Sequence, residues 1–166
     1  MGRPINYHAR ALLTDASAFE RKLDVPVLIW KGAHEPGPAA PQPTTSSGHD
    51  ELRPQGGETL VFELRKRANK NNPFSMGVTI GRVEANDIQI DDTSVSRFHA
   101  YFLSTGDGWQ VVDADSKNGS WLDGLKLEGS KKTRLNPTAR LRFGDVEMTF
   151  MAPAVFLKHL RESMAS

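Results

Sequence analysis

The chain contains no cysteine among its 166 residues, and it carries almost no net charge. The missing thiols exclude disulfide frameworks, zinc–thiolate sites and cysteine nucleophiles. Lysine and arginine number 21 against 20 aspartates and glutamates, which gives a net charge of +1. Proteins that bind nucleic acids or membrane surfaces usually carry a clear basic excess, so the composition argues against both classes. Basic residues do cluster at 65–67 and within 126–142, and we interpret both runs as solvated strand edges.

Long hydrophobic runs are also missing. The longest, at residues 25–30, is interrupted by Pro26 and is far too short to cross a bilayer. The N-terminus lacks the apolar stretch of a signal peptide. We therefore expect a cytoplasmic protein with one domain and appendages, or at most two small domains, as the length allows.

Changes in composition predict four segments, namely 1–35, 36–57, 58–152 and 153–166. In the first, apolar residues at helical spacing predict a helix over residues 9–22, or a shorter one capped by Thr14 or Asp15. The apolar run at 25–30 predicts a short buried strand after the helix. The last segment predicts one amphipathic helix with Pro153 near its N-terminus.

The second segment, 36–57, is rich in proline, serine, threonine and glycine and has almost no apolar content. Such a segment cannot offset the entropy cost of ordering, so we interpret it as a flexible linker. It contains Thr44 and Thr45. If a kinase modified one of them, the domain could bind its own linker, although a spacer that is never modified is the simpler interpretation.

The third segment, 58–152, is dense in strand signals. Short stretches of alternating apolar residues recur about every ten residues, with few helix signals between them. Gly106-Asp107-Gly108 supplies a hairpin turn. The predicted fold class is therefore all-β, an antiparallel β-sandwich with an N-terminal helix-plus-strand segment and a C-terminal helix. The alternating residues include Leu60, Phe62, Leu64, Val78, Ile80, Ile88, Ile90, Phe102, Leu141, Phe143, Met148 and Phe150.

Three short polar clusters lie between these strands, so each falls in a loop or at a strand end. They are Gly81-Arg82, Ser96-Arg97-Phe98-His99 and Asn118-Gly119. An arginine fork donates two parallel, charge-assisted hydrogen bonds to phosphate, and a serine hydroxyl can donate to another phosphate oxygen. A carboxamide in a turn before glycine could hydrogen-bond the backbone of an extended ligand. Together the loops suit a bound phosphate at one end of the sandwich.

The order and spacing of the three clusters resemble the forkhead-associated (FHA) domain. The same likeness extends to Asp113-Ala114-Asp115-Ser116 and to Phe143-Gly144-Asp145. The resemblance implies a module that binds phosphothreonine peptides, without catalysis and without a cofactor. The residues that it assigns to the phosphopeptide are Arg82 and Ser96 on the phosphate, Arg97 and Lys117 in support, and Asn118 on the peptide backbone. The residues that it assigns to structural support of the site are Gly81, His99 and Gly119.

The sequence departs from the family pattern in two places. Lys117 and Ser120 replace the threonines often found on either side of Asn118-Gly119. Asp123 stands where many members have asparagine before Gly124. Neither change removes a group that phosphate binding requires.

Each predicted site residue also has a plain structural interpretation. Arg82 could form a surface ion pair with Glu84 or Asp87, and such pairs contribute little. Ser96 could be a turn or capping hydroxyl. Asn118-Gly119 would form a tight turn with or without a ligand. Only the occurrence of all three clusters in order favours a ligand site.

We expect the function to be that of an adaptor in serine/threonine kinase signalling, with a phosphothreonine-containing kinase or kinase substrate as the partner. A phosphate-independent docking scaffold, which would use the sheet face or the terminal segments, is the alternative. A hydrolytic triad of Ser96, His99 and Asp113 lacks a nucleophile elbow and an oxyanion loop. The histidines lack paired-ligand spacing, so no metal site is expected either.

Overall fold

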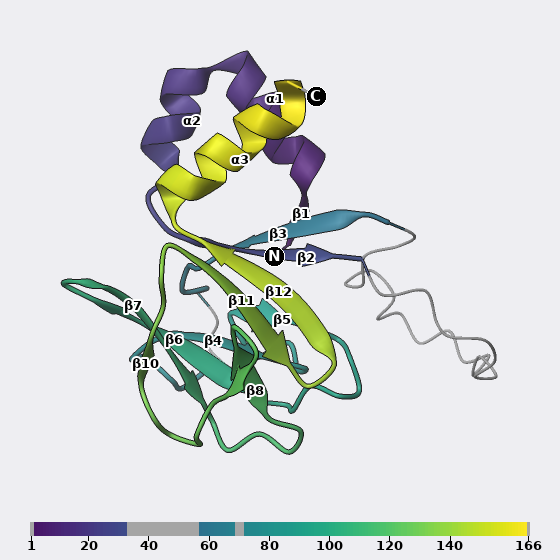
Figure 1. Ribbon diagram of the computed structural model, residues 1–166, viewed down its shortest axis with the longest axis vertical. Helices are drawn as coiled ribbons and strands as arrows, with labels where there is room; N and C mark the ends of the chain where they lie inside the picture. Colours follow the sequence, from purple (N-terminus) through teal and green to yellow (C-terminus); the bar gives the residue numbers. More distant parts are fainter. Residues whose placement is uncertain (1, 33–56, 69–71, 166) are drawn as a thin grey trace.

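The computed structural model describes residues 2–32, 57–68 and 72–165. Two β-sheets form the body of the molecule, and helices gather at one end of it (Figure 1). Almost all of the predicted linker, including Thr44 and Thr45, lies outside the described residues.

The two sheets confirm the predicted β-sandwich. One sheet has seven strands in the order β1 (Arg3–Pro4), β3 (Thr59–Glu63), β2 (Val27–Lys31), β12 (Val146–Met151), β11 (Thr138–Phe143), β8 (Ser120–Leu122) and β9 (Leu125–Lys126). The other has five in the order β10 (Thr133–Arg134), β7 (Gly108–Asp113), β6 (Ala100–Thr105), β4 (Val78–Gly81) and β5 (Ile88–Gln89). The β4–β5 pair is parallel, which the sequence pattern did not predict. The predicted hairpin turn joins β6 to β7.

Strand β2 explains why residues 27–30 are all apolar. Leu28 and Trp30 face the core between the two sheets, whereas Val27 and Ile29 pack against a second core that includes the helices. Because successive side chains of a strand point to opposite faces, a strand that is covered on both faces must be apolar at every position. The predicted burial of this run is confirmed.

Three helices cover the outer face of the seven-stranded sheet at one end (Figure 1). They are α1 (Ile5–Thr14), α2 (Ala16–Lys22) and α3 (Pro153–Ala165). A single helix over residues 9–22 is therefore wrong, because Asp15 leaves the helical conformation and caps α2 by accepting a hydrogen bond from Ala18 N at 3.0 Å. The alternative prediction, a shorter helix capped by Asp15, is confirmed for α2. The C-terminal helix is confirmed.

The N-terminal segment is part of the sheet. β2 pairs with β3 from Val27 to Lys31, and on its other side it pairs with β12. The bond from Gly32 N to Glu58 O, at 3.1 Å, continues this pairing beyond the strands. The division of the chain at residues 35, 57 and 152 stays a proposal.

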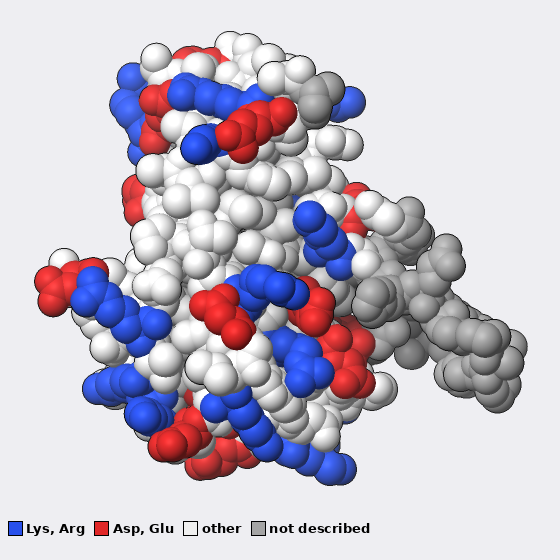
Figure 2. Space-filling model, viewed as in Figure 1, with Lys and Arg blue, Asp and Glu red and all other residues white. Residues whose placement is uncertain are grey.

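Charges of both signs are interspersed on the face shown in Figure 2, in keeping with the small net charge. Within the described residues, no helix is both long enough and apolar enough to cross a membrane.

The burial of His8 on α1 predicts that acid weakens the packing of the helices on the sheet. It is 3% exposed, contacts Phe19 and Phe156 edge-on, and its Nε2 has no hydrogen-bond partner among the described residues. Burial lowers the pKa of His8 below 6.5, with a smaller opposing effect from Glu63. Neutral His8 therefore stabilises the fold above pH 6.5, and this contribution is lost as the pH falls through the lowered pKa.

We expect His8→Leu to reduce the loss of stability between about pH 7.5 and about pH 5, measured as the urea midpoint at each pH. His159→Leu, in α3, is the control and should leave that loss unchanged. Equal losses in the wild type and in His8→Leu would contradict the prediction.

Candidate functional site

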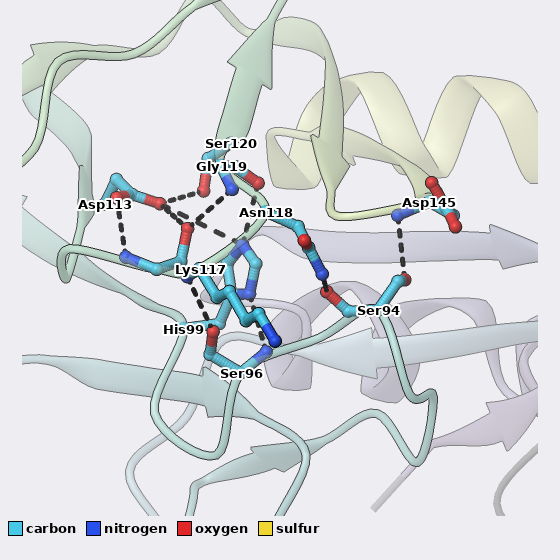
Figure 3. A network of polar contacts seen from close by, with 10 residues as sticks. Ser94, Ser96, His99, Asp113, Lys117, Asn118, Gly119, Ser120 and Asp145 are labelled. Carbon is cyan, nitrogen blue, oxygen red and sulfur yellow. Dashed lines mark hydrogen bonds and ion pairs between the residues drawn. The ribbon is translucent and has the colours of Figure 1, made fainter.

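Ser96 is the junction of three loops at one end of the sandwich (Figure 3). Its carbonyl accepts a hydrogen bond from Arg82 N at 2.9 Å, which ties it to the loop after β4. Its hydroxyl accepts one from Lys117 N at 3.0 Å, which ties it to the loop after β7. Its own N–H donates to His99 Nδ1 at 3.0 Å. The loops that carry the predicted site residues therefore meet at one residue.

His99 is fully buried beneath these loops and bridges two of them. Because Nδ1 accepts from Ser96 N, the proton lies on Nε2, which donates to Gly119 O at 3.0 Å. Burial lowers the pKa of His99, while the bond to Gly119 and the charge of Asp113 oppose that shift. The ring also packs edge-on against Phe143 at 5.6 Å. The neutral imidazole thus fixes the distance between the Ser96 and Gly119 loops.

Asp113, at the end of β7, closes the loop that follows it. Its Oδ1 accepts hydrogen bonds from Ser116 Oγ at 2.6 Å and from Ser120 Oγ at 2.5 Å, and its Oδ2 accepts one from Ser116 N at 3.1 Å. Ser116 Oγ in turn accepts from Gly119 N at 3.0 Å. Ser120, which departs from the family's threonine, is fully buried and keeps the hydroxyl that this contact needs. Asp113 and Ser116 belong to the stretch that resembles the FHA domain, and their spacing is also a recognised signal for a turn closed by a side-chain hydrogen bond.

The same contacts show that Ser96, His99 and Asp113 are not arranged as a nucleophilic triad. A triad needs a hydrogen bond between the hydroxyl and the base. Here His99 Nδ1 faces the main chain of Ser96 rather than its hydroxyl, and Nε2 faces Gly119 O. Among the described residues, no group of three or more potential ligand side chains could hold a metal ion.

Arg82 lies half-buried beside Ser96, and its guanidinium has no protein partner among the described residues. Its Nε is buried without a hydrogen bond. Asp87, a partner considered from the sequence, is occupied by Lys66 Nζ at 2.8 Å and by Thr79 N at 2.9 Å. Buried donors are nearly always satisfied, so this guanidinium is available to an anion.

Asn118 is exposed at the tip of the loop after β7, and its position is fixed by a residue that the sequence analysis missed. Its Nδ2 donates to Ser94 O at 2.8 Å. Ser94 Oγ is itself held between Asp92 Oδ1 at 2.7 Å and Asp145 N at 2.8 Å. One N–H and the Oδ1 of the Asn118 carboxamide remain for a ligand. The contact with Asp92 is local, but the partners that tie Ser94 to the site, Asn118 and Asp145, come from loops distant in the chain.

Arg97 and Lys117 are exposed beside the junction, and no hydrogen bond or ion pair among the described residues involves the end of either side chain. The backbone of Arg97 is fixed, since its carbonyl accepts from Asn86 Nδ2 at 2.6 Å. Gly81 approaches this carbonyl so closely that a Cβ would collide with it. Asn86, which is buried, is another supporting residue that the sequence analysis missed.

The two hydrogen bonds of the His99 ring predict that replacing the imidazole by an apolar ring destabilises the fold. We expect His99→Phe to lower the free energy of unfolding by about 1–3 kcal/mol, because Ser96 N would lose its acceptor while Gly119 O would keep only the bond from Gly144 N. Urea unfolding measures this, with His159→Phe in the partly exposed α3 position as the control. A loss no larger than that of the control would show that the bridge contributes little.

The chain matches the FHA domain family model over residues 78–144. It is 31% identical over 117 residues to the transcriptional regulatory protein EmbR of Mycobacterium tuberculosis, a match that covers 67% of this chain and 30% of EmbR. The chain thus spans less than a third of that relative. It is 30% identical over 110 residues to the oxoglutarate dehydrogenase inhibitor of Corynebacterium efficiens, covering 64% of this chain and 73% of the inhibitor.

Two solved structures resemble the fold. EmbR of M. tuberculosis in complex with a low-affinity phosphopeptide has a TM-score of 0.43 and 32% identity, covering 46% of this chain and 20% of that chain. The MEK1 FHA domain in complex with a HOP1 phosphothreonine peptide has a TM-score of 0.44 and 22% identity, covering 55% of this chain and 87% of that chain. The family model and the inhibitor, most of whose length the chain covers, decide the family. The chain belongs to the FHA domain family, and an FHA domain is a non-catalytic module that binds phosphothreonine peptides.

Proposed function

We propose that the loop site binds a phosphothreonine segment of another protein, with Arg82 and Ser96 on the phosphate and Asn118 on the peptide backbone. The observation that carries the proposal is the guanidinium of Arg82. It lies beside Ser96 with a buried Nε that lacks a protein partner among the described residues.

The donors around the junction match a phosphate dianion. The Ser96 hydroxyl accepts from Lys117 N, so its own hydrogen is free to donate to a ligand. Arg97 and Lys117 add positive charge on the exposed side. A phosphothreonine carries nearly two negative charges at neutral pH, and each charge-assisted hydrogen bond contributes about 1.5–3 kcal/mol net. Two or three such bonds support affinities in the micromolar range once the cost of association is subtracted.

The site is held together without a ligand. His99, Asp113 and the contact between Asn118 and Ser94 fix the loops through hydrogen bonds within the chain. Binding therefore spends little free energy on ordering loops, and more of the interaction energy contributes to affinity.

The wider role that we propose is that of an adaptor in serine/threonine kinase signalling, in the cytoplasm, with a kinase or its substrate as the partner. The support is the family membership and the regulatory names of the relatives, a transcriptional regulator and an enzyme inhibitor. No nucleic acid or membrane partner is part of the proposal.

A docking scaffold that needs no phosphate is a second candidate, favoured by one observation. A groove of about 930 Å³ lies between α1, α2 and β3, away from the loop site, and Tyr7 on its lining is 49% exposed. Binding there would not depend on Arg82, so the same variant separates the two candidates.

We expect Arg82→Ala to weaken binding of phosphothreonine peptides by about 100-fold or more, because it removes a bidentate, charge-assisted contact. Ser96→Ala should cost about tenfold, the loss of one hydrogen bond to a charged group. Fluorescence anisotropy against a degenerate phosphothreonine library, with unphosphorylated peptides alongside, measures both.

Arg134→Ala is the matched control, since Arg134 is an exposed arginine that donates to Asp107 O, outside the three site loops. It should bind as the wild type does. Partner capture that survives Arg82→Ala would reject the phosphate reader for that partner and favour the docking scaffold.

A further inference from the structure

A tryptophan with a cation on each side lies next to the loop that carries Asn118. Trp121 on β8 pairs directly with Lys126 on β9 and with Arg142 on β11. The guanidinium carbon of Arg142 lies 3.8 Å from the ring centroid of Trp121, and Lys126 Nζ lies 5.7 Å from it. Both distances fall within the range of cation–π attraction.

Lys126 reaches from this ladder to the turn beside Asn118. Gly119, which follows Asn118, has a φ of +88°, and a Cβ placed on it would lie 3.0 Å from Lys126 Cε and 3.2 Å from the Trp121 ring. The end of the Lys126 side chain therefore touches the Asn118–Gly119 turn. A peptide whose backbone lies on Asn118 must pass close to this ammonium group.

Lys126 has no carboxylate partner among the described residues, and neither has Arg142. Glu147 on β12 is the cross-strand neighbour of Arg142, but the two form no ion pair. Asp113, the acid beneath the loop, is buried, and Ser116 and Ser120 occupy it. Figure 2 shows long lysine and arginine side chains protruding at the lower end of the molecule, where Figure 1 draws β8, with acidic side chains close to some of them. The two cations of the ladder are therefore not neutralised by ion pairs among the described residues, although Asp92 and Asp145 lie on the Ser94 side of Asn118.

We propose that Lys126 contacts a second anionic group of the bound phosphopeptide, so that the domain selects phosphothreonine segments with an acidic neighbour. The anion is a carboxylate or a second phosphate, which share this chemistry. The inference rests on the proposed function of the loop site. Trp121 and Arg142 act as positioning residues, because the ring supports the lysine stem and Arg142 covers the ring.

The arrangement makes Lys126 more effective than an ordinary surface lysine. An exposed ion pair usually contributes little, partly because a long side chain must lose rotamer freedom to hold one geometry. Lys126 has already lost some of that freedom, since its Cε lies against Gly119 and its Nζ lies over the Trp121 ring. A plain structural role, in which Lys126 only shields the ring from water, would not depend on the charge of the peptide. Reversing the charge of residue 126, and of the peptide residue that it would contact, therefore separates the two roles.

The test uses phosphothreonine peptides that carry alanine, aspartate, phosphoserine or lysine at one flanking position at a time. The wild-type protein should bind the aspartate or phosphoserine form about three- to tenfold more tightly than the lysine form at one position or more. Lys126→Glu should reverse this order at the same position, whereas the alanine peptide should change by less than about twofold with Lys126→Ala. The form that gains more from Lys126 identifies the anion as a carboxylate or a phosphate.

Lys158→Glu is the control, because it makes the same change of charge on α3, where the lysine pairs with Glu162 at 3.9 Å. It should leave the order of the peptides unchanged. An equal loss for every peptide with Lys126→Glu, or the absence of any preference in the wild type, would overturn the inference while Arg82-dependent binding remains. Binding that is insensitive to Arg82→Ala would instead reject the proposed function and this inference with it.

Discussion

The site depends on one buried, neutral imidazole. His99 connects the main chain of Ser96 to that of Gly119 through one hydrogen bond at each ring nitrogen. The ring is fully buried, so water does not compete for either bond. The spacing of these two loops positions the exposed site residues Arg82 and Asn118. Arg82 is positioned through Ser96 O, and Asn118 projects from the turn that Gly119 ends. Groups that would otherwise lie on separate flexible loops are thus held at fixed distances before any ligand arrives.

The sandwich positions these loops, and the helices stabilise the sheet from outside. β2, β3 and β12 are covered on one face by the five-stranded sheet and on the other by α1, α2 and α3. The loop site lies away from the helical layer (Figure 1). The helical layer therefore adds buried apolar area to the fold without covering the loops, and it leaves their exposed side chains free to bind.

The sequence predicted the strands where local periodicity decides them, as in the alternation of Leu60 and Phe62. It predicted Arg82, Ser96 and Asn118 through a pattern of short clusters. Features set by contacts between distant segments could not be predicted. The place of β2 between β3 and β12 depends on partners far apart in the chain, and so do the bonds that Ser94 and Asn86 make. The contact of Lys126 with Gly119 is local, but it depends on the register of the β8–β9 hairpin, which alternation of apolar residues alone does not decide.

The pairing of β2 with β3 has a consequence for proteolysis. The two strands are adjacent and antiparallel, and the bond from Gly32 N to Glu58 O joins the two ends of the intervening 33–56 segment. A single cut within that segment would not release the N-terminal piece, because β2 keeps both neighbouring strands and its helices keep their core. The cleaved molecule would run as two bands on a denaturing gel and as one species in solution.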